Sequence, residues 1–298
     1  MPSFYRTAAW IIANAGPLRP VLRGVARVAY GVLHRFTGGM IANPLPFEGF
    51  IVHHHNDAVF APMLATGGFE AETTRLLREV LTPGMHVLDV GANIGVMSLI
   101  AARAIGPSGT VDAFEPGPTI VATLRRNIAA NGFSDRVHVN AMAVGSAPGS
   151  IQIHVAPTGD ALASIYAEAA ETGGGKSVAT DVRLTTLDEW GAEHQWPHVD
   201  LVKIDVEGAE IAVLEGMREM CRRSDGLKLI IEFNVRTLRI AALKPEDLFS
   251  ALRARGFSRI RIIDYGLEAF DPNTDLERLL QRITDANVEG VNLFCERV

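Results

Sequence analysis

The sequence predicts an α/β protein built on a mostly parallel β-sheet. Strand-like and helix-like segments alternate along most of the chain after residue 71, which is typical of consecutive βαβ units. A glycine turn, Gly91 to Gly95, follows the first strand, and acidic residues stand at the ends of several strands. Ligands bind beyond the carboxyl ends of parallel strands, so these acids indicate where a site should lie.

The first half of the alternation is read from apolar runs that end at turn residues. A helix over 71–81 leads into Pro83-Gly84, and Val87, Leu88 and Val90 then form a buried strand. The pattern continues with a helix over 94–104, a strand over 110–114, a helix over 119–131 and a strand over 137–140.

The pattern changes after Gly145. Residues 151–155 and 177–184 read as two strands that flank a polar insertion rich in glycine and alanine. Alternation then resumes with a strand over 201–205, a helix over 209–221, a strand over 227–233, a helix over 245–255, a strand over 259–263 and a last strand over 291–295.

Length and composition exclude several classes of protein. The 298 residues can bury one large core or two small ones, and 48% apolar and 21% charged residues are usual for a globular protein. A net charge of −6 disfavours a nucleic-acid partner. Two cysteines, Cys221 and Cys295, make no disulfide framework. With no apolar run long enough to span a membrane, we expect a cytoplasmic protein.

Residues 1–60 are predicted to form a basic amphipathic helical arm and a loop-rich linker, and residues 61–298 the catalytic domain. Arg19, Arg23 and Arg27 share one helix face, and the first 47 residues contain no acid. Two roles stay open for this arm. It can dock on the domain or on a second subunit in a homo-oligomer, or it can make peripheral contact with an anionic membrane.

The glycine turn indicates S-adenosylmethionine more strongly than a nicotinamide cofactor. Glu115 ends the second strand, twenty residues past Gly95, where a carboxylate can accept both ribose hydroxyl hydrogens. A dinucleotide site needs Gly-x-Gly-x-x-Gly, but Asn93 takes the second glycine position. Asp89 repels phosphate and suits a cation. S-adenosylmethionine has a ribose, a positive charge and no phosphate.

A second motif, residues 199–210, delivers acids to the end of another buried strand. Asp205 and Glu207 precede Gly208, which permits entry into a helix. Carboxylates so closely spaced at a strand end are typical of the edge of an active site.

Together these segments resemble the FkbM-type S-adenosylmethionine-dependent methyltransferases. The similarity covers about residues 65–235, in the order of the family. Its pieces are Gly67-Gly68-Phe69-Glu70, the segments 87–95, 113–116 and 126–131, Ala143-Val144-Gly145, Thr186-Leu187-Asp188-Glu189 and the segment 203–210. The resemblance implies a class I methyltransferase fold, which is a Rossmann-like sheet of seven strands with an antiparallel last strand. It also implies O-methylation of a hydroxyl group on a sugar, glycolipid or secondary metabolite.

The expected site combines this resemblance with the motifs. Glu115 is expected to bind the ribose, and Met142 to lie against the adenine. The methionine end of the cofactor is assigned to Glu70, Asp89, Gly91, Asn93, Gly95 and Asp205. The acceptor is a small molecule or a glycan, and Asp205, Glu207, His54 and His55 all stay open as the base that removes its proton. Glu232 and Asn234 could join Asp205 around a divalent cation, but they are interpreted as structural polar groups, so no metal site is expected. A nicotinamide-dependent oxidoreductase and a non-catalytic binding module remain the alternative functions.

Overall fold

The computed structural model describes residues 40–44, 50–54, 70–155, 163–167 and 177–297. Most of the predicted N-terminal arm lies outside these residues, and so does His55.

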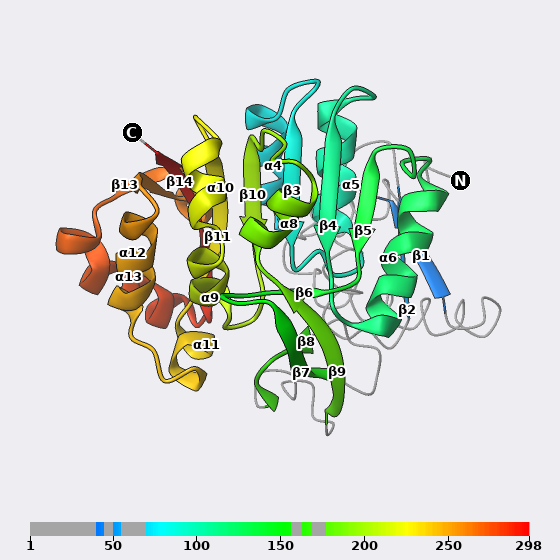
Figure 1. The fold of residues 1–298 in the computed structure, drawn as a ribbon. Coiled ribbons are helices and arrows are strands. Elements are labelled where there is room, and N and C mark those ends of the chain that lie inside the picture. The colour runs from blue at the N-terminus through cyan, green and yellow to red at the C-terminus, as the bar shows by residue number, and fades with distance from the viewer. Residues whose placement is uncertain (1–39, 45–49, 55–69, 156–162, 168–176, 298) are drawn as a thin grey trace, which may run out of the picture.

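A central sheet organises the described part of the chain (Figure 1). Its strands follow the order β13-β12-β14-β11-β10-β3-β4-β5. The strands are β3 (His86–Val90), β4 (Thr110–Phe114), β5 (Val137–Asn140), β10 (Leu201–Ile204), β11 (Lys228–Asn234), β12 (Phe257–Ile262), β13 (Glu268–Phe270) and β14 (Gly290–Arg297). β14 runs antiparallel to both of its neighbours, and the pairs from β11 through β5 are parallel. The predicted class I sheet with an antiparallel last strand is therefore confirmed, and β13 extends it as a hairpin with β12.

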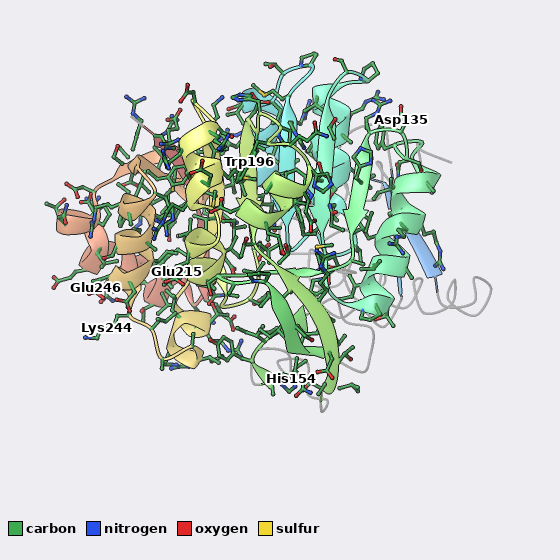
Figure 2. All side chains as sticks on the ribbon, in the orientation of Figure 1. Asp135, His154, Trp196, Glu215, Lys244 and Glu246 are labelled. Carbon is green, nitrogen blue, oxygen red and sulfur yellow. The ribbon has the colours of Figure 1, made fainter. Side chains whose placement is uncertain are left out.

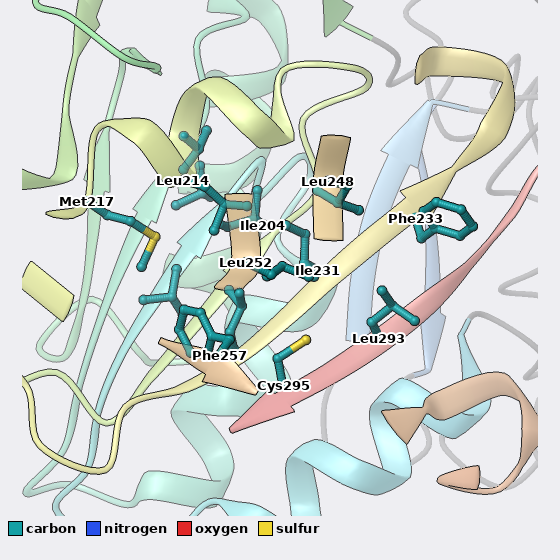
Figure 3. Close-up of a cluster of buried hydrophobic side chains, with 14 of the residues drawn as sticks. Ile204, Leu214, Met217, Ile231, Phe233, Leu248, Leu252, Phe257, Leu293 and Cys295 are labelled. Carbon is teal, nitrogen blue, oxygen red and sulfur yellow. The ribbon is translucent and has the colours of Figure 1, made fainter. Parts of the chain in front are cut away.

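Helices cover both faces of this sheet, because its strands are apolar on both sides. One face packs against α4 (Ala71–Val80), α5 (Val96–Ile105) and α6 (Pro118–Ala130). The other face packs against α8 (Leu187–Glu193), α9 (Glu210–Glu215), α10 (Arg218–Arg223), α12 (Pro245–Ala254) and α13 (Pro272–Ala286). Figure 3 shows part of this second core, where Ile204 and Ile231 from neighbouring strands meet Leu214 and Leu252 from the helices.

The insertion after Gly145 forms a small separate sheet. Its order is β6-β9-β7-β8, and β7 and β9 pair antiparallel, as the two predicted flanking strands allow. The strands are β6 (Ala143–Val144), β7 (Gly149–Val155), β8 (Ala163–Ser164) and β9 (Val178–Thr185). In Figure 1 this sheet projects from one end of the central sheet.

The helix predicted over 209–221 is wrong in one respect, because it is two helices, α9 and α10. The break falls at Gly216, where a Cβ would collide with the backbone carbonyl of Gly145. Asp188 then starts the second helix, since its carboxylate accepts hydrogen bonds from the backbone N–H groups of Glu219 and Met220. A side chain far away in the sequence therefore decides where the helix restarts.

Other elements were not expected from the sequence pattern. The predicted linker contains an antiparallel pair, β1 (Met40–Pro44) and β2 (Phe50–His54). The helices α8, α11 (Val235–Ile240) and α13 and the short 3₁₀ helix η2 (Ile263–Tyr265) fill segments that the alternation of strands and helices had left unassigned.

Strands β3 and β10, which are neighbours in the central sheet, come close together at Gly91. β3 and β10 are paired in parallel, and the backbone N–H of Asp205 donates to the carbonyl of Val90 at 3.0 Å. Gly91 has φ +82°, and a Cβ there would overlap the carbonyl oxygen of Asp205. Only glycine fits, because it lacks the Cβ and accepts a positive φ.

We predict that Gly91→Ala destabilises the protein far more than a glycine change at the same backbone angle elsewhere. Gly132→Ala is the matched control, since Gly132 has φ +73° and nothing within 4 Å of an added Cβ. The control should lose about 1–2 kcal/mol from left-handed strain, and Gly91→Ala about 1–3 kcal/mol more from overpacking. Urea unfolding measures both, and equal losses would contradict the close approach.

Candidate active site

A cavity of about 250 Å³ opens where β3, β4, β10 and β11 end. Residues of the small sheet, among them Ile153 and Ser164, form part of its wall. The acidic side chains that line it come from four separate segments of the chain and are Glu70, Glu115, Asp205, Glu207 and Glu232. Of the predicted strand-end acids, Glu115, Asp205 and Glu207 thus meet at one place, whereas Asp89 does not line the cavity.

The glycine turn after β3 is held by the neighbouring strand and helices. The backbone N–H groups of Gly91 and Ala92 both donate to the carbonyl of Phe114, at 3.0 and 2.9 Å. Asn93 has φ +52°, a left-handed conformation that asparagine tolerates better than most residues. A Cβ on Gly95 would meet the side chain of Leu124 on α6. Close packing therefore accounts for the glycines at positions 91 and 95. Gly91 and Asn93 also line the cavity.

Glu115 is fastened to the two loops beside it. Its Oε2 accepts from the backbone N–H of Asn93 at 3.0 Å, and its Oε1 accepts from that of Gly117 at 2.8 Å. The residue is only 4% exposed. Burial raises the pKa of Glu115 to about 7, although the two backbone hydrogen bonds oppose this rise. Each oxygen keeps a further lone pair, so a bound hydroxyl can still donate to it.

The loop after β10 presents Asp205 and Glu207 to the cavity. Glu207 has φ +52°, and its carbonyl accepts from Ser164 Oγ at 2.8 Å. Glu210 accepts from the backbone N–H groups of Val206 and Gly208, at 3.2 and 3.1 Å. Glu210 therefore holds the loop, while the side chain of Glu207 stays on the cavity wall. Burial first, and then the charge of Asp205, raise the pKa of Glu207 to about 8.

Glu70 and Glu232 both border the cavity. Glu70 is the residue before α4, and Asn292 Nδ2 donates to its Oε2 at 3.4 Å. Asn292 is the cross-strand partner of Glu232. Burial and the neighbouring carboxylates raise the pKa of Glu232 well above its ordinary value. Asn234 donates to Glu232 through Nδ2, and its Oδ1 caps α11.

Asp89 and Met142 occupy different surroundings. Asp89 is 2% exposed and accepts from Ser98 Oγ at 2.5 Å, so its carboxylate lies beneath the cavity and not on the lining. Met142 lines the cavity after β5.

Only the backbone of His54, at the end of β2, is described, and His55 lies outside the described residues. Another histidine, His154, lies on β7 of the small sheet (Figure 2), and its imidazole is hydrogen-bonded to Ser177 Oγ at 3.3 Å.

The described residues contain neither a cluster of metal-binding side chains nor a membrane-spanning helix. No group of three or more His, Cys, Asp or Glu side chains there is arranged to hold a metal ion. None of the described helices has both the length and the apolar composition that a membrane span requires.

Comparison with known proteins assigns the class. Residues 89–259 match the family model of the methyltransferase FkbM domain. Methyltransferase sdnD from Sordaria araneosa is 29% identical over 200 residues, which are 59% of this chain and 74% of that protein. The 31-O-demethyl-FK506 methyltransferase FkbM from Streptomyces tacrolimicus is 31% identical over 163 residues, which are 47% of this chain and 62% of that protein. An O-methyltransferase from Bacillus cereus in complex with SAH is similar with a TM-score of 0.41 and 14% identity, over 77% of this chain and 80% of that one.

The protein is therefore a methyltransferase, and it belongs to the FkbM methyltransferase domain family. The predicted family is confirmed, and it sets aside the nicotinamide-dependent oxidoreductase and the non-catalytic module. S-adenosylmethionine is the cofactor. The cavity fits it, because a buried carboxylate with free lone pairs suits a ribose and an acidic lining suits its ammonium and sulfonium charges.

Sequence reasoning missed Lys203 and the wall of the small sheet. Lys203 lines the cavity, and its Nζ donates to Asp205 Oδ2 at 2.8 Å. A lysine between apolar residues in a predicted buried strand, Val202 and Ile204, is the signal that could have singled it out. Ile153 and Ile165 gave no such signal, since nothing local indicates that the insertion folds back over the strand ends.

We predict that the free energy of unfolding of the ligand-free protein depends on Glu207 in a defined pH window. The pKa of Glu207 is about 8 when folded against an ordinary 4.5. The protonated form favours folding, so this contribution is complete below pH 4.5 and is lost as pH rises through 8. Glu207→Gln should therefore flatten the fall of the melting temperature between pH 5.5 and 8.5. Glu277→Gln on α13, an exposed control, should not, and equal slopes in all three proteins would contradict the buried state of Glu207.

Proposed function

We propose that the protein transfers the methyl group of S-adenosylmethionine to a hydroxyl group of a sugar, glycolipid or secondary metabolite. The observation that carries this proposal is the meeting of Glu115, Asp205 and Glu207 at one cavity. Glu115 is suited to the ribose of the cofactor, Asp205 to its ammonium group, and Glu207 to an acceptor hydroxyl bound in the same cavity. A relative named for 31-O-methylation of FK506 supports a hydroxyl acceptor.

The cofactor-binding roles follow from the chemistry of the lining. We assign the ribose hydroxyls to Glu115 and the adenine to Met142. Glu70 and Asp205 are assigned to the ammonium group of the methionine end, since both are acids on the cavity wall. We also assign Gly91, Asn93 and Gly95 to the methionine end, where they shape the turn. Asp89 would contribute its negative charge from beneath this turn.

Bound S-adenosylmethionine would supply an electrophilic methyl group, and its sulfur would leave as the neutral thioether of S-adenosylhomocysteine. The chain then has to align the acceptor and remove its proton. Glu207 is the preferred base among the candidates, because its pKa of about 8 lies near neutral pH and a base is most effective there. Asp205 is less suited, since its Oδ2 already accepts from Lys203. The roles proposed for His54 and His55 stay predictions.

The acceptor side of the cavity is partly apolar. Ile153, Ile165 and Val206 line it together with Glu207, so an acceptor with both an apolar surface and a hydroxyl group is favoured. Docking of the arm, peripheral membrane contact and homo-oligomer formation depend on residues outside the described part and stay predictions.

We predict that the full-length protein transfers labelled methyl from S-adenosylmethionine to the small-molecule, glycan or lipid fraction of a cell extract. Glu207→Gln should lower this rate about 10²–10⁴-fold, the usual contribution of a general base. Its affinity for S-adenosylhomocysteine should stay within about twofold, because the proposed role concerns only the acceptor.

The stability of the labelled product in alkali distinguishes a methyl ether from a methyl ester. An O-methyl ether survives mild alkali, whereas a methyl ester releases its label as methanol. Label confined to protein or nucleic acid, or label lost in mild alkali, would contradict the proposed acceptor. Glu277→Gln should transfer methyl at the wild-type rate.

A further inference from the structure

Lys203 is a buried cation in the centre of the sheet. It lies on β10 between Asp89 of β3 and Ile230 of β11 in the register, and it is 4% exposed. Among the described residues that line the cavity, it carries the positive charge, and the other charged side chains are all acids. Burying an ammonium group is costly in free energy unless the group is paired. An apolar side chain at position 203, similar to the neighbouring Ile230, would be buried at a lower desolvation cost.

The surroundings of Lys203 are acidic on several sides. Its Nζ donates to Asp205 Oδ2 at 2.8 Å, which forms an ion pair between a buried lysine and a partly exposed aspartate. Burial lowers the pKa of Lys203, but the charges of Asp205, Asp89 and Glu70 raise it by more. Lys203 therefore stays protonated throughout the neutral pH range.

The charge of Lys203 acts in turn on the acids. Burial raises the pKa of Glu70 to about 7, and Lys203 is the largest influence that lowers it. The charges of Asp205 and of Asp264 in η2 push it up. Asp89 on β3 shows the same balance between burial and Lys203.

Glu232 on β11 completes this group, because Glu70 is among the carboxylates that raise its pKa. Without Lys203, the carboxylates of Glu70, Asp89 and Asp205 would have no basic side chain beside them among the described residues that line the cavity. Lys203 is the group that allows part of them to stay ionised.

We propose that Lys203 is a positioning residue for cofactor binding, which orients the Asp205 carboxylate through the ion pair and preserves the negative charge of Glu70. The cofactor's ammonium group then meets a preformed acidic surface. This inference rests on the assignment of Glu70 and Asp205 to the methionine end of the cofactor.

The test is calorimetric titration of S-adenosylhomocysteine into the full-length protein and into Lys203→Met, from pH 6 to pH 8.5. Loss of the lysine charge raises the pKa of Glu70, so more of it is protonated at pH 7. The variant should bind roughly tenfold more weakly at pH 7, which corresponds to about one pKa unit, and the ratio of dissociation constants should shrink towards pH 8.5. Taking the ratio at each pH cancels the ionisation of the ligand itself.

Lys228→Met is the matched control, since Lys228 lies at the start of the neighbouring strand β11, and it should bind as the wild type does. A ratio that stays constant with pH would show a merely structural role and overturn the proposal. Unchanged affinity of Lys203→Met would also overturn it. If the wild type itself fails to bind, the cofactor site is at fault and not Lys203 alone.

A second variant covers the case in which Lys203→Met does not fold. Glu70→Gln removes the acid at the surface of the cavity and leaves the central strands untouched. It should lower affinity at pH 7.5 about as much as is expected for Lys203→Met. Wild-type affinity in Glu70→Gln would contradict the proposal, because Glu70 would then contribute nothing to the cofactor's ammonium group.

Discussion

The close approach of Gly91 to the carbonyl of Asp205 is the constraint on which the site depends. It allows β3 and β10 to stay paired up to their ends, so that the glycine turn and the acidic loop emerge side by side. Glu115 reaches the same point, because β4 is paired in register with β3. A side chain at position 91 would separate the two loops, and the cavity between them depends on their contact.

The second consequence is a concentration of buried negative charge. Glu70, Glu115 and Glu207 have pKa values raised to about 7, 7 and 8 respectively, primarily by burial. Such carboxylates lower the stability of the ligand-free fold above neutral pH. A cationic ligand offsets this cost by supplying the missing opposite charge. The electrostatic cost of the ligand-free fold and the preference for S-adenosylmethionine therefore have one physical origin.

Much of the fold followed from the sequence, because most strands of the central sheet are short, mainly apolar runs, such as residues 87–90 apart from Asp89, that end at acids or turn residues. Glu115, Asp205 and Glu207 were predictable for the same reason. The break at Gly216 was not, since it depends on contact with Gly145 and on capping by Asp188. The role of Lys203 was also hidden, because its partners Glu70 and Asp89 come from more than a hundred residues away.

The measurement that tests the central claim most directly is calorimetric titration of S-adenosylhomocysteine into the wild type and Glu115→Gln at pH 8. The variant keeps the size of the side chain but replaces one acceptor oxygen with a donor. Its binding free energy should be weaker by about 1.5–3 kcal/mol, the range for hydrogen bonds to a charged group, while the exposed-site control Asp135→Asn binds normally. Wild-type affinity in a folded Glu115→Gln protein would contradict a cofactor site at this edge of the sheet.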